Sequence, residues 1–168
     1  VHDNTVAWIA TWKENIKGDN KYVLFAPSST IRSNKDREKF ETARRLKNCV
    51  NKIRKQIEVD LTSKDEMIRQ RATAVWIIDR LALRVGNEKN KEEEADTVGC
   101  CSLRVEHIKL HPPTTVEFEF LGKDSMKYHN SVQVEEQVFK NLQSFCKSKK
   151  PDEDIFDRLT VRSAWLLL

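Results

Sequence analysis

The sequence predicts an α+β fold that is mostly helical, with an N-terminal β-hairpin and a small three-stranded antiparallel sheet. Two long segments carry apolar residues at three- and four-residue steps, which is the period of an amphipathic helix. Between residues 103 and 132 apolar residues recur at every second position, which is the period of a strand with one buried face. The composition agrees, because 39% of the 168 residues are hydrophobic, 33% are charged, and only four are glycine and four proline.

The N-terminal segment is expected to form the hairpin. Two apolar or β-prone runs, residues 6–12 and 21–26, are separated by the sequence ENIKGDN. Gly18 and Asn20 in this linker suit a turn, so the two runs are expected to pair.

The first helix is expected to begin near Ser33 or Asn34, either of which can cap it, and to run to about Val59. Nine basic and three acidic residues between Lys35 and Lys55 give this helix a net charge of +6, although the whole chain carries only +4. Such a surface suits a polyanion, because phosphate neutralisation supplies most nonspecific affinity for nucleic acid; a solvated helix face is the alternative. The opposite face is expected to pack in the core through Phe40, Ala43, Leu46, Val50, Ile53 and Ile57.

The second helix is expected to open with a capping box in which Ser63 and Glu66 satisfy each other's end of the first turn. It is expected to end near Val85, with Gly86 as the left-handed residue that stops it. From Ala72 onward the segment is apolar nearly all round, which predicts an interior helix.

Three strands are expected next, over residues 103–110, 116–120 and 126–132. The second and third are joined by LGKDS, in which Gly122 suits a hairpin turn. Lys123 is therefore expected at an exposed tip.

A last helix is expected over residues 134–147, before Pro151, and its buried face should contain Val134, Val138, Leu142 and Phe145. The longest apolar runs of the chain are too short to cross a bilayer, so no membrane partner is expected.

The four cysteines are expected to be free thiols of a reducing compartment. Cys100 and Cys101 are adjacent, and neighbouring residues bridge only with strain. A zinc site formed by these two thiols with His107 and His111 is conceivable, but the usual paired spacing is missing. No metal or other cofactor is expected.

Several motifs together resemble the core of eukaryotic type IB DNA topoisomerases: TARRLKNCVNKIR, LALRVGNEK, ADTVGCCSLRVEHI, VEFEFLGKDS and VFKNLQ. The resemblance runs from about His2 to Leu159. It implies that residues 1–29 end a cap region that embraces DNA, that residues 30–159 form the N-terminal part of the catalytic core, and that residues 160–168 are a divergent tail. It also implies a nuclear, chromosome-associated enzyme that acts on double-stranded DNA and relaxes supercoils through a transient single-strand break.

The resemblance assigns catalytic roles to Arg84 and Lys123. By position alone, Arg84 would be a cation that stabilises a helix end and Lys123 a solvated turn residue. In the family's mechanism the arginine offsets charge on the phosphorane transition state, and the lysine protonates the leaving 5′-oxygen. The aspartate of GKDS, here Asp124, is implicated in the response to camptothecin-type drugs. Together with both catalytic residues, the family positions expected to contact DNA are Lys21, Tyr22, Lys39, Gly86, Asn87, Glu88, Lys89 and Thr97.

The family's chemistry uses two arginines, a lysine, a histidine and a tyrosine that forms a 3′-phosphotyrosyl intermediate. The chain matches only the first arginine and the lysine, and neither Tyr22 nor Tyr128 lies in the context of the nucleophile. We therefore expect the chain alone to be inactive. The alternatives are a split enzyme completed by a separate tyrosine-bearing polypeptide, a non-catalytic DNA-binding module, and a fragment that does not fold stably. A tyrosine recombinase is disfavoured, because the motifs match topoisomerases more specifically.

Overall fold

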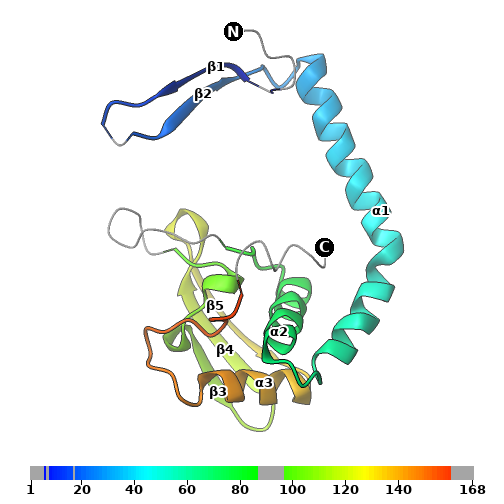
Figure 1. The fold of residues 1–168 in the computed structure, drawn as a ribbon, viewed down its shortest axis with the longest axis vertical. Helices are drawn as coiled ribbons and strands as arrows, with labels where there is room; N and C mark the ends of the chain where they lie inside the picture. The colour runs from blue at the N-terminus through cyan, green and yellow to red at the C-terminus, as the bar shows by residue number, and fades with distance from the viewer. Residues whose placement is uncertain (1–5, 7, 17, 87–96, 160–168) are drawn as a thin grey trace. The chain divides into compact units, whose positions relative to one another are not determined.

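The computed structural model of the chain describes residues 6, 8–16, 18–86 and 97–159 (Figure 1). Over these residues it contains three α-helices, one two-stranded antiparallel sheet and one three-stranded antiparallel sheet, which confirms the predicted α+β class. The chain divides into two compact units, Val1–Val50 and Asn51–Leu168. The boundary proposed at residue 29 from the family resemblance stays a prediction.

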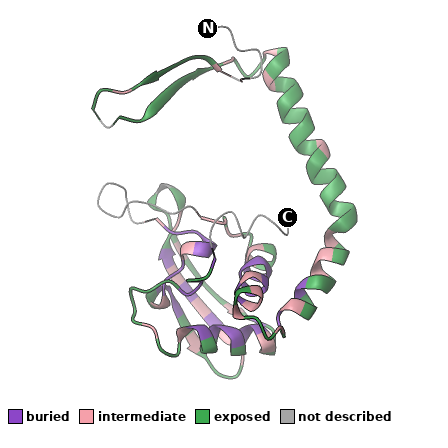
Figure 2. Cartoon of the chain, viewed as in Figure 1, coloured by how far each residue is buried: buried purple, intermediate pink, exposed green. Residues whose placement is uncertain are grey.

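The predicted hairpin is confirmed in the first unit. Strand β1 (Trp8–Lys13) pairs antiparallel with β2 (Asn20–Leu24), and Gly18 has a φ of +74° in the connecting turn. All of β2 and most of β1 are exposed (Figure 2), so the ribbon has no buried face of its own in the described residues.

Helix α1 (Thr30–Asp60) begins earlier than predicted. The hydroxyl of Ser29 accepts a hydrogen bond from the backbone N–H of Arg32 at 3.3 Å. Ser29 therefore takes the capping role that the sequence analysis gave to Ser33 or Asn34, and that start was wrong. The end at Asp60 agrees with the predicted end near Val59.

The predicted core face of α1 is only partly correct. Within this helix, which the structure describes throughout, Ile57 alone is buried, and Ile53 packs against the same cluster. Phe40 is 66% exposed and Leu46 is 38% exposed. Periodicity shows which face of a helix is apolar but not whether another element covers that face.

Helix α2 (Glu66–Leu81) has an interior face, as predicted: its buried residues are Gln70, Ala72, Thr73, Ala74, Val75, Trp76 and Ile77. Both predicted ends need correction. Asp65 caps the helix, because its carboxylate accepts from the N–H of Met67 at 2.8 Å, so the Ser63–Glu66 capping box was wrong. The helix stops at Leu81 rather than near Val85, and its left-handed C-cap residue is Ala82, with a φ of 52°. Gly86 also has a positive φ, but it lies beyond the end of the helix and does not stop it.

The three-stranded sheet has the order β3–β4–β5, formed by β3 (Ile108–His111), β4 (Thr115–Leu121) and β5 (Lys127–Gln133). Its inner face is buried through Val116, Phe118 and Phe120, as the alternation predicted. The first strand is shorter than predicted, because the N–H of Arg104 donates to Nδ1 of His107 at 3.0 Å and closes a 3-10 turn (Val105–His107) where a strand was expected.

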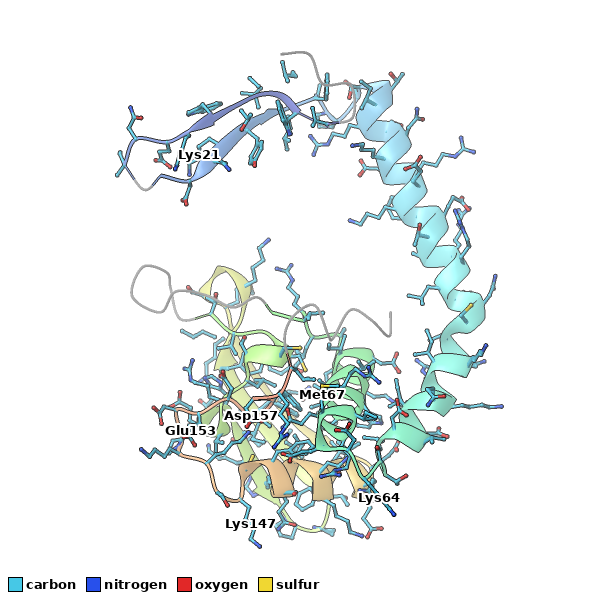
Figure 3. The ribbon with its side chains drawn as sticks, in the orientation of Figure 1. Lys21, Lys64, Met67, Lys147, Glu153 and Asp157 are labelled. Atoms are coloured by element: carbon cyan, nitrogen blue, oxygen red, sulfur yellow. The ribbon has the colours of Figure 1, made fainter. Side chains whose placement is uncertain are left out.

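Helix α3 (Glu136–Cys146) confirms the last predicted helix, and Val134, Val138, Leu142 and Phe145 are all buried. The segment after it is held to α2 by hydrogen bonds. The buried Gln70 donates to Asp157 at 2.7 Å and accepts from the N–H of Arg158 at 3.0 Å. Figure 3 labels Asp157 in this segment. None of the described helices is both long and apolar enough to cross a membrane.

Candidate nucleic-acid interface and catalytic residues

Arg84 was predicted to lie in the last turn of a helix, and that position was wrong. It lies instead in the segment that follows α2. This segment pairs through its backbone with residues far along the chain. The carbonyl of Arg84 accepts from the N–H of Cys100 at 2.8 Å, and the carbonyl of Val85 accepts from the N–H of Cys101 at 2.7 Å. The hydrogen bonds hold the backbone of Arg84 in place while its side chain remains exposed.

Two glycines permit this pairing. Gly86 has a φ of +88°, and a Cβ on it would lie 2.8 Å from the Cα of Gly99. A Cβ on Gly99 would overlap the backbone N and Cα of Gly86. No side chain fits at such a separation, so the two segments approach this closely only because both residues are glycine. Sequence reasoning selected Gly86 as a DNA contact and missed Gly99, for which the ADTVG motif was the available signal.

The turn that carries Lys123 is joined to the segment that contains Gly99. The N–H of Val98, next to Gly99, donates to the carbonyl of Leu121 at 2.8 Å. Leu121 ends β4, and Lys123 lies two residues later in a 3-10 turn (Lys123–Ser125) that leads into β5. One short segment thus pairs with both the Arg84 segment and the end of the Lys123 hairpin.

The turn itself differs from the prediction in one respect. Lys123 is exposed, as expected, but Gly122 has an ordinary φ of −87°. The left-handed residue of the turn is Ser125, with a φ of 56°. The backbone of Asp124 belongs to the turn, and its side chain lies outside the described part of the structure.

Both candidate catalytic side chains are available to a ligand. Within the described part of the chain, no residue forms a hydrogen bond or an ion pair with the guanidinium of Arg84 or the ammonium of Lys123. An exposed cation without a partner can pair with a phosphate without first losing an internal interaction. Asn87, Glu88 and Lys89, predicted to contact DNA, lie outside the described residues; Gly86 and the half-buried Thr97 flank them.

Of the three residues of the first unit that were predicted to contact DNA, one has an ionic partner, one has an aromatic neighbour and one has no partner among the described residues. Lys21, labelled on β2 in Figure 3, forms an ion pair with Glu14 at 2.9 Å, and hydrogen bonding to that carboxylate raises the pKa of Lys21. Tyr22 is 50% exposed, and its ring centroid lies 6.2 Å from that of Trp8. Lys39 is exposed on α1 and has no partner among the described residues.

Most of the basic side chains of α1 are free of internal partners. Of the nine between residues 35 and 55, two form ion pairs within the described structure: Arg44 with Glu41, and Arg54 with Asp79 on α2. The Arg54 pair has two hydrogen bonds, at 2.8 and 2.9 Å, and lowers the pKa of Asp79. Arg54 therefore contributes to packing, and Arg44 is paired within its own helix. The other seven basic side chains can bind a polyanion.

The cysteines are free thiols, as predicted. Burial raises the pKa of Cys101 to about 11 and that of Cys100 well above its usual range, so both are neutral thiols at pH 7. The imidazole of His107 caps its own turn, and His111 hydrogen-bonds Glu117. Over the described residues, no group of three or more His, Cys, Asp or Glu side chains is arranged to hold a metal ion.

The outer face of the sheet carries an ionic cluster around Glu117. Nε2 of His111 and Nε2 of His129 lie 3.1 and 3.2 Å from its two carboxylate oxygens, and Nζ of Lys109 lies at 3.4 Å. These hydrogen bonds, first from His111 and then from His129, lower the pKa of Glu117 to about 2. Both histidines thus lie on the outer surface of the sheet.

Comparison with known proteins gives one consistent result. The model of the eukaryotic DNA topoisomerase I catalytic core matches residues 28–164. The chain is 59% identical to human DNA topoisomerase 1 over 163 residues, with 94% of the chain and 21% of the human protein covered. It is 54% identical to DNA topoisomerase 1 of Caenorhabditis elegans, with the same coverage, and 52% identical to that of Drosophila melanogaster, with 96% of the chain and 17% of the relative covered. The chain thus spans about a fifth of the length of these relatives.

The Glu117 cluster predicts a specific loss of stability in acid. Because its pKa is about 2 in the folded chain and near 4.5 ordinarily, the folded state binds fewer protons than the unfolded state between these values. Its stabilising effect is complete above pH 4.5 and is lost as the pH falls towards about 2. In urea unfolding followed by circular dichroism, Glu117→Gln should therefore lose less stability across this window than the parent chain.

The matched control is Glu58→Gln, which changes an exposed carboxylate on α1 without a described partner. It should follow the parent curve. Equal acid sensitivity of Glu117→Gln and the parent would contradict the role of the cluster.

Proposed function

The chain belongs to the eukaryotic DNA topoisomerase I family, and from this premise we propose that it forms the part of a type IB enzyme that grips and protonates the scissile phosphodiester. The observation that carries the proposal is the placement of Arg84 and Lys123. Both side chains are exposed and unpaired among the described residues, and their backbones are joined through residues 98–100.

In this mechanism a tyrosine outside the matched motifs attacks the phosphorus. A bond forms between the tyrosine oxygen and phosphorus as the tyrosine hydroxyl gives its proton to solvent, and the bond from phosphorus to the 5′-oxygen breaks. Arg84 binds two nonbridging oxygens and offsets the charge that develops on the phosphorane. Lys123 donates a proton to the 5′-oxygen, which is otherwise a poor leaving group.

The reverse reaction uses the same residues. After the free end has rotated, the 5′-hydroxyl attacks the phosphorus of the 3′-phosphotyrosyl ester and gives its proton to Lys123. The bond from phosphorus to the tyrosine oxygen breaks, the tyrosine takes up a proton from solvent, and the strand is resealed. The energy of the broken bond is retained in the ester, so the proposed relaxation requires no ATP. The partner is double-stranded DNA, and we place the enzyme in the nucleus by analogy with the family.

The basic helix supplies affinity in this proposal. The unpaired cations of α1, among them Lys39, would neutralise phosphates and position the duplex without reading its sequence. The same observation favours a second candidate, a DNA-binding module without cleavage activity. If a separate polypeptide supplied the tyrosine, the chain would be one subunit of a split enzyme.

The catalytic proposal is tested in a chimera in which this chain replaces the aligned region of human DNA topoisomerase 1. Arg84→Ala and Lys123→Ala should each lower the rate of plasmid relaxation by about 100-fold or more, because each removes a group that acts on the transition state. The matched controls are Arg80→Ala, four residues before Arg84, and Lys127→Ala, on the same hairpin as Lys123. Relaxation by Lys123→Ala at the parent rate would refute the proposed proton donor.

The isolated chain should bind duplex DNA with an affinity that falls steeply with salt. The triple variant Lys39→Gln, Arg45→Gln, Lys47→Gln, which removes three unpaired cations of α1, should reduce the slope of log K against log salt by about 2 to 3, roughly one phosphate contact for each cation. The control removes three charges elsewhere, at Lys140, Lys147 and Lys150, and should leave the slope unchanged. An equal effect of both triple variants, measured by fluorescence anisotropy, would show that net charge rather than the helix determines binding.

The isolated chain should not relax plasmid DNA, because its sequence provides two of the five catalytic groups of the family's mechanism. The measurement is a relaxation assay followed by denaturing electrophoresis, with the active chimera as the positive control. A covalent adduct between DNA and the 168-residue chain would overturn this expectation.

A further inference from the structure

Large apolar side chains are exposed at four described positions of the second unit: Val59, Met67, Leu121 and Met126. Two of the four border the Lys123 turn, where Leu121 is 44% exposed and Met126 is 71% exposed. A single exposed apolar residue on a protein surface needs no explanation. Here two of them flank one exposed cationic turn, so a ligand that binds the lysine would also meet these apolar side chains.

The backbone of Met126 is tied directly to the turn. The N–H of Gly122 donates to the carbonyl of Met126 at 2.8 Å, and the N–H of Met126 donates to the carbonyl of Lys123 at 3.3 Å. The position of Met126 relative to Lys123 is therefore set by hydrogen bonds on both of its backbone groups.

The two apolar side chains lie on opposite faces of the hairpin. Leu121 follows the alternation of β4 and shares the outer face with Glu119. Met126 precedes Lys127, the partner of Leu121, so alternation places it on the face of Tyr128. The ring of Tyr128 stacks on Phe120 with centroids 4.9 Å apart, and Met126 precedes Tyr128 by two residues at the exposed end of the hairpin.

We propose that Met126, with Leu121 on the other face, is a positioning residue that seats the Lys123 turn in a groove of the bound duplex. This inference rests on the proposed role of Lys123 as proton donor. Apolar side chains can insert along the minor groove, and the flexible, polarisable side chain of methionine adapts to irregular surfaces. Seated in this way, Met126 excludes water from the ammonium and limits the directions from which Lys123 approaches the leaving oxygen.

This seating acts on the chemical step more than on affinity. A general acid must lie within hydrogen-bond reach of the oxygen that it protonates, and a shift of about 1 Å can cost on the order of 100-fold in rate. In the proposed function, the phosphate contacts that determine affinity come from the unpaired cations of α1. Loss of the apolar seat should therefore slow cleavage even when DNA is saturating.

The test uses the chimera with human DNA topoisomerase 1 and two duplex substrates. One has the ordinary 5′-oxygen at the scissile bond, and the other has sulfur at that position. When sulfur leaves, the bond from phosphorus to sulfur breaks and a stable thiolate departs, so no proton donor is needed.

The variants are Met126→Gln, which keeps the length of the side chain but makes it polar, and Met126→Leu, which keeps it apolar. The matched control is Met67→Gln at the other exposed methionine, labelled on α2 in Figure 3.

In single-turnover cleavage at saturating DNA, Met126→Gln should slow the oxygen substrate about tenfold and the sulfur substrate less than about twofold. Met126→Leu should cleave the oxygen substrate at a rate within about threefold of the parent rate, and Met67→Gln should cleave it at the parent rate. Normal cleavage of the sulfur substrate also shows that a variant is folded.

Two results would overturn the role of Met126 and leave the proposed role of Lys123 standing. One is cleavage of the oxygen substrate by Met126→Gln at the parent rate, and the other is an equal loss of cleavage rate on both substrates. Lys123→Ala distinguishes this from a failure of the proposed function. A Lys123→Ala variant that cleaves the oxygen substrate as fast as the parent would remove the proton donor, and with it the role of Met126.

Discussion

The close contact between Gly86 and Gly99 is the constraint on which the candidate site depends. Because neither residue has a Cβ, the segment after α2 can lie against the segment that begins at Thr97. Backbone hydrogen bonds then join Arg84 to Cys100 and Val98 to Leu121. Any side chain at Gly99 would separate these segments, and the Arg84 backbone would lose its fixed relation to the hairpin that carries Lys123.

The charged side chains fall into two groups with different roles. Arg54 and Lys149 are held by internal acceptors: Arg54 by two hydrogen bonds to Asp79, and Lys149 by the carbonyls of Asp154 and Ile155. Arg84, Lys123 and most cations of α1 have no such partner in the described structure. A cation with an internal partner must give up that interaction to bind phosphate, whereas an unpaired one need not. This difference separates residues that hold the fold from residues that can bind DNA.

Several departures from the sequence analysis share one cause, which is a hydrogen-bonding partner that local pattern does not reveal. Helix α2 ends at Leu81 because residues 84 and 85 pair with Cys100 and Cys101, and this pairing offsets the cost of about 1–2 kcal/mol for a left-handed Ala82. The first sheet strand is shortened because His107 bonds the backbone of Arg104. Apolar periodicity identified the face of α1 around Phe40 correctly but could not show that this face is exposed.

The sequence by itself determined the fold class, the order of the elements, the interior position of α2 and the inward residues of α3 and the sheet, because these follow from the apolar content and the periods of helices and strands. Its motifs also led to the family and to the choice of Arg84 and Lys123. Only the tertiary structure decided where α2 ends, which cations are already paired, and how the segments of Arg84 and Lys123 are joined. Those features depend on contacts between residues distant in the chain, such as Gly86 with Gly99 and Val98 with Leu121, and the local pattern around either partner does not record them.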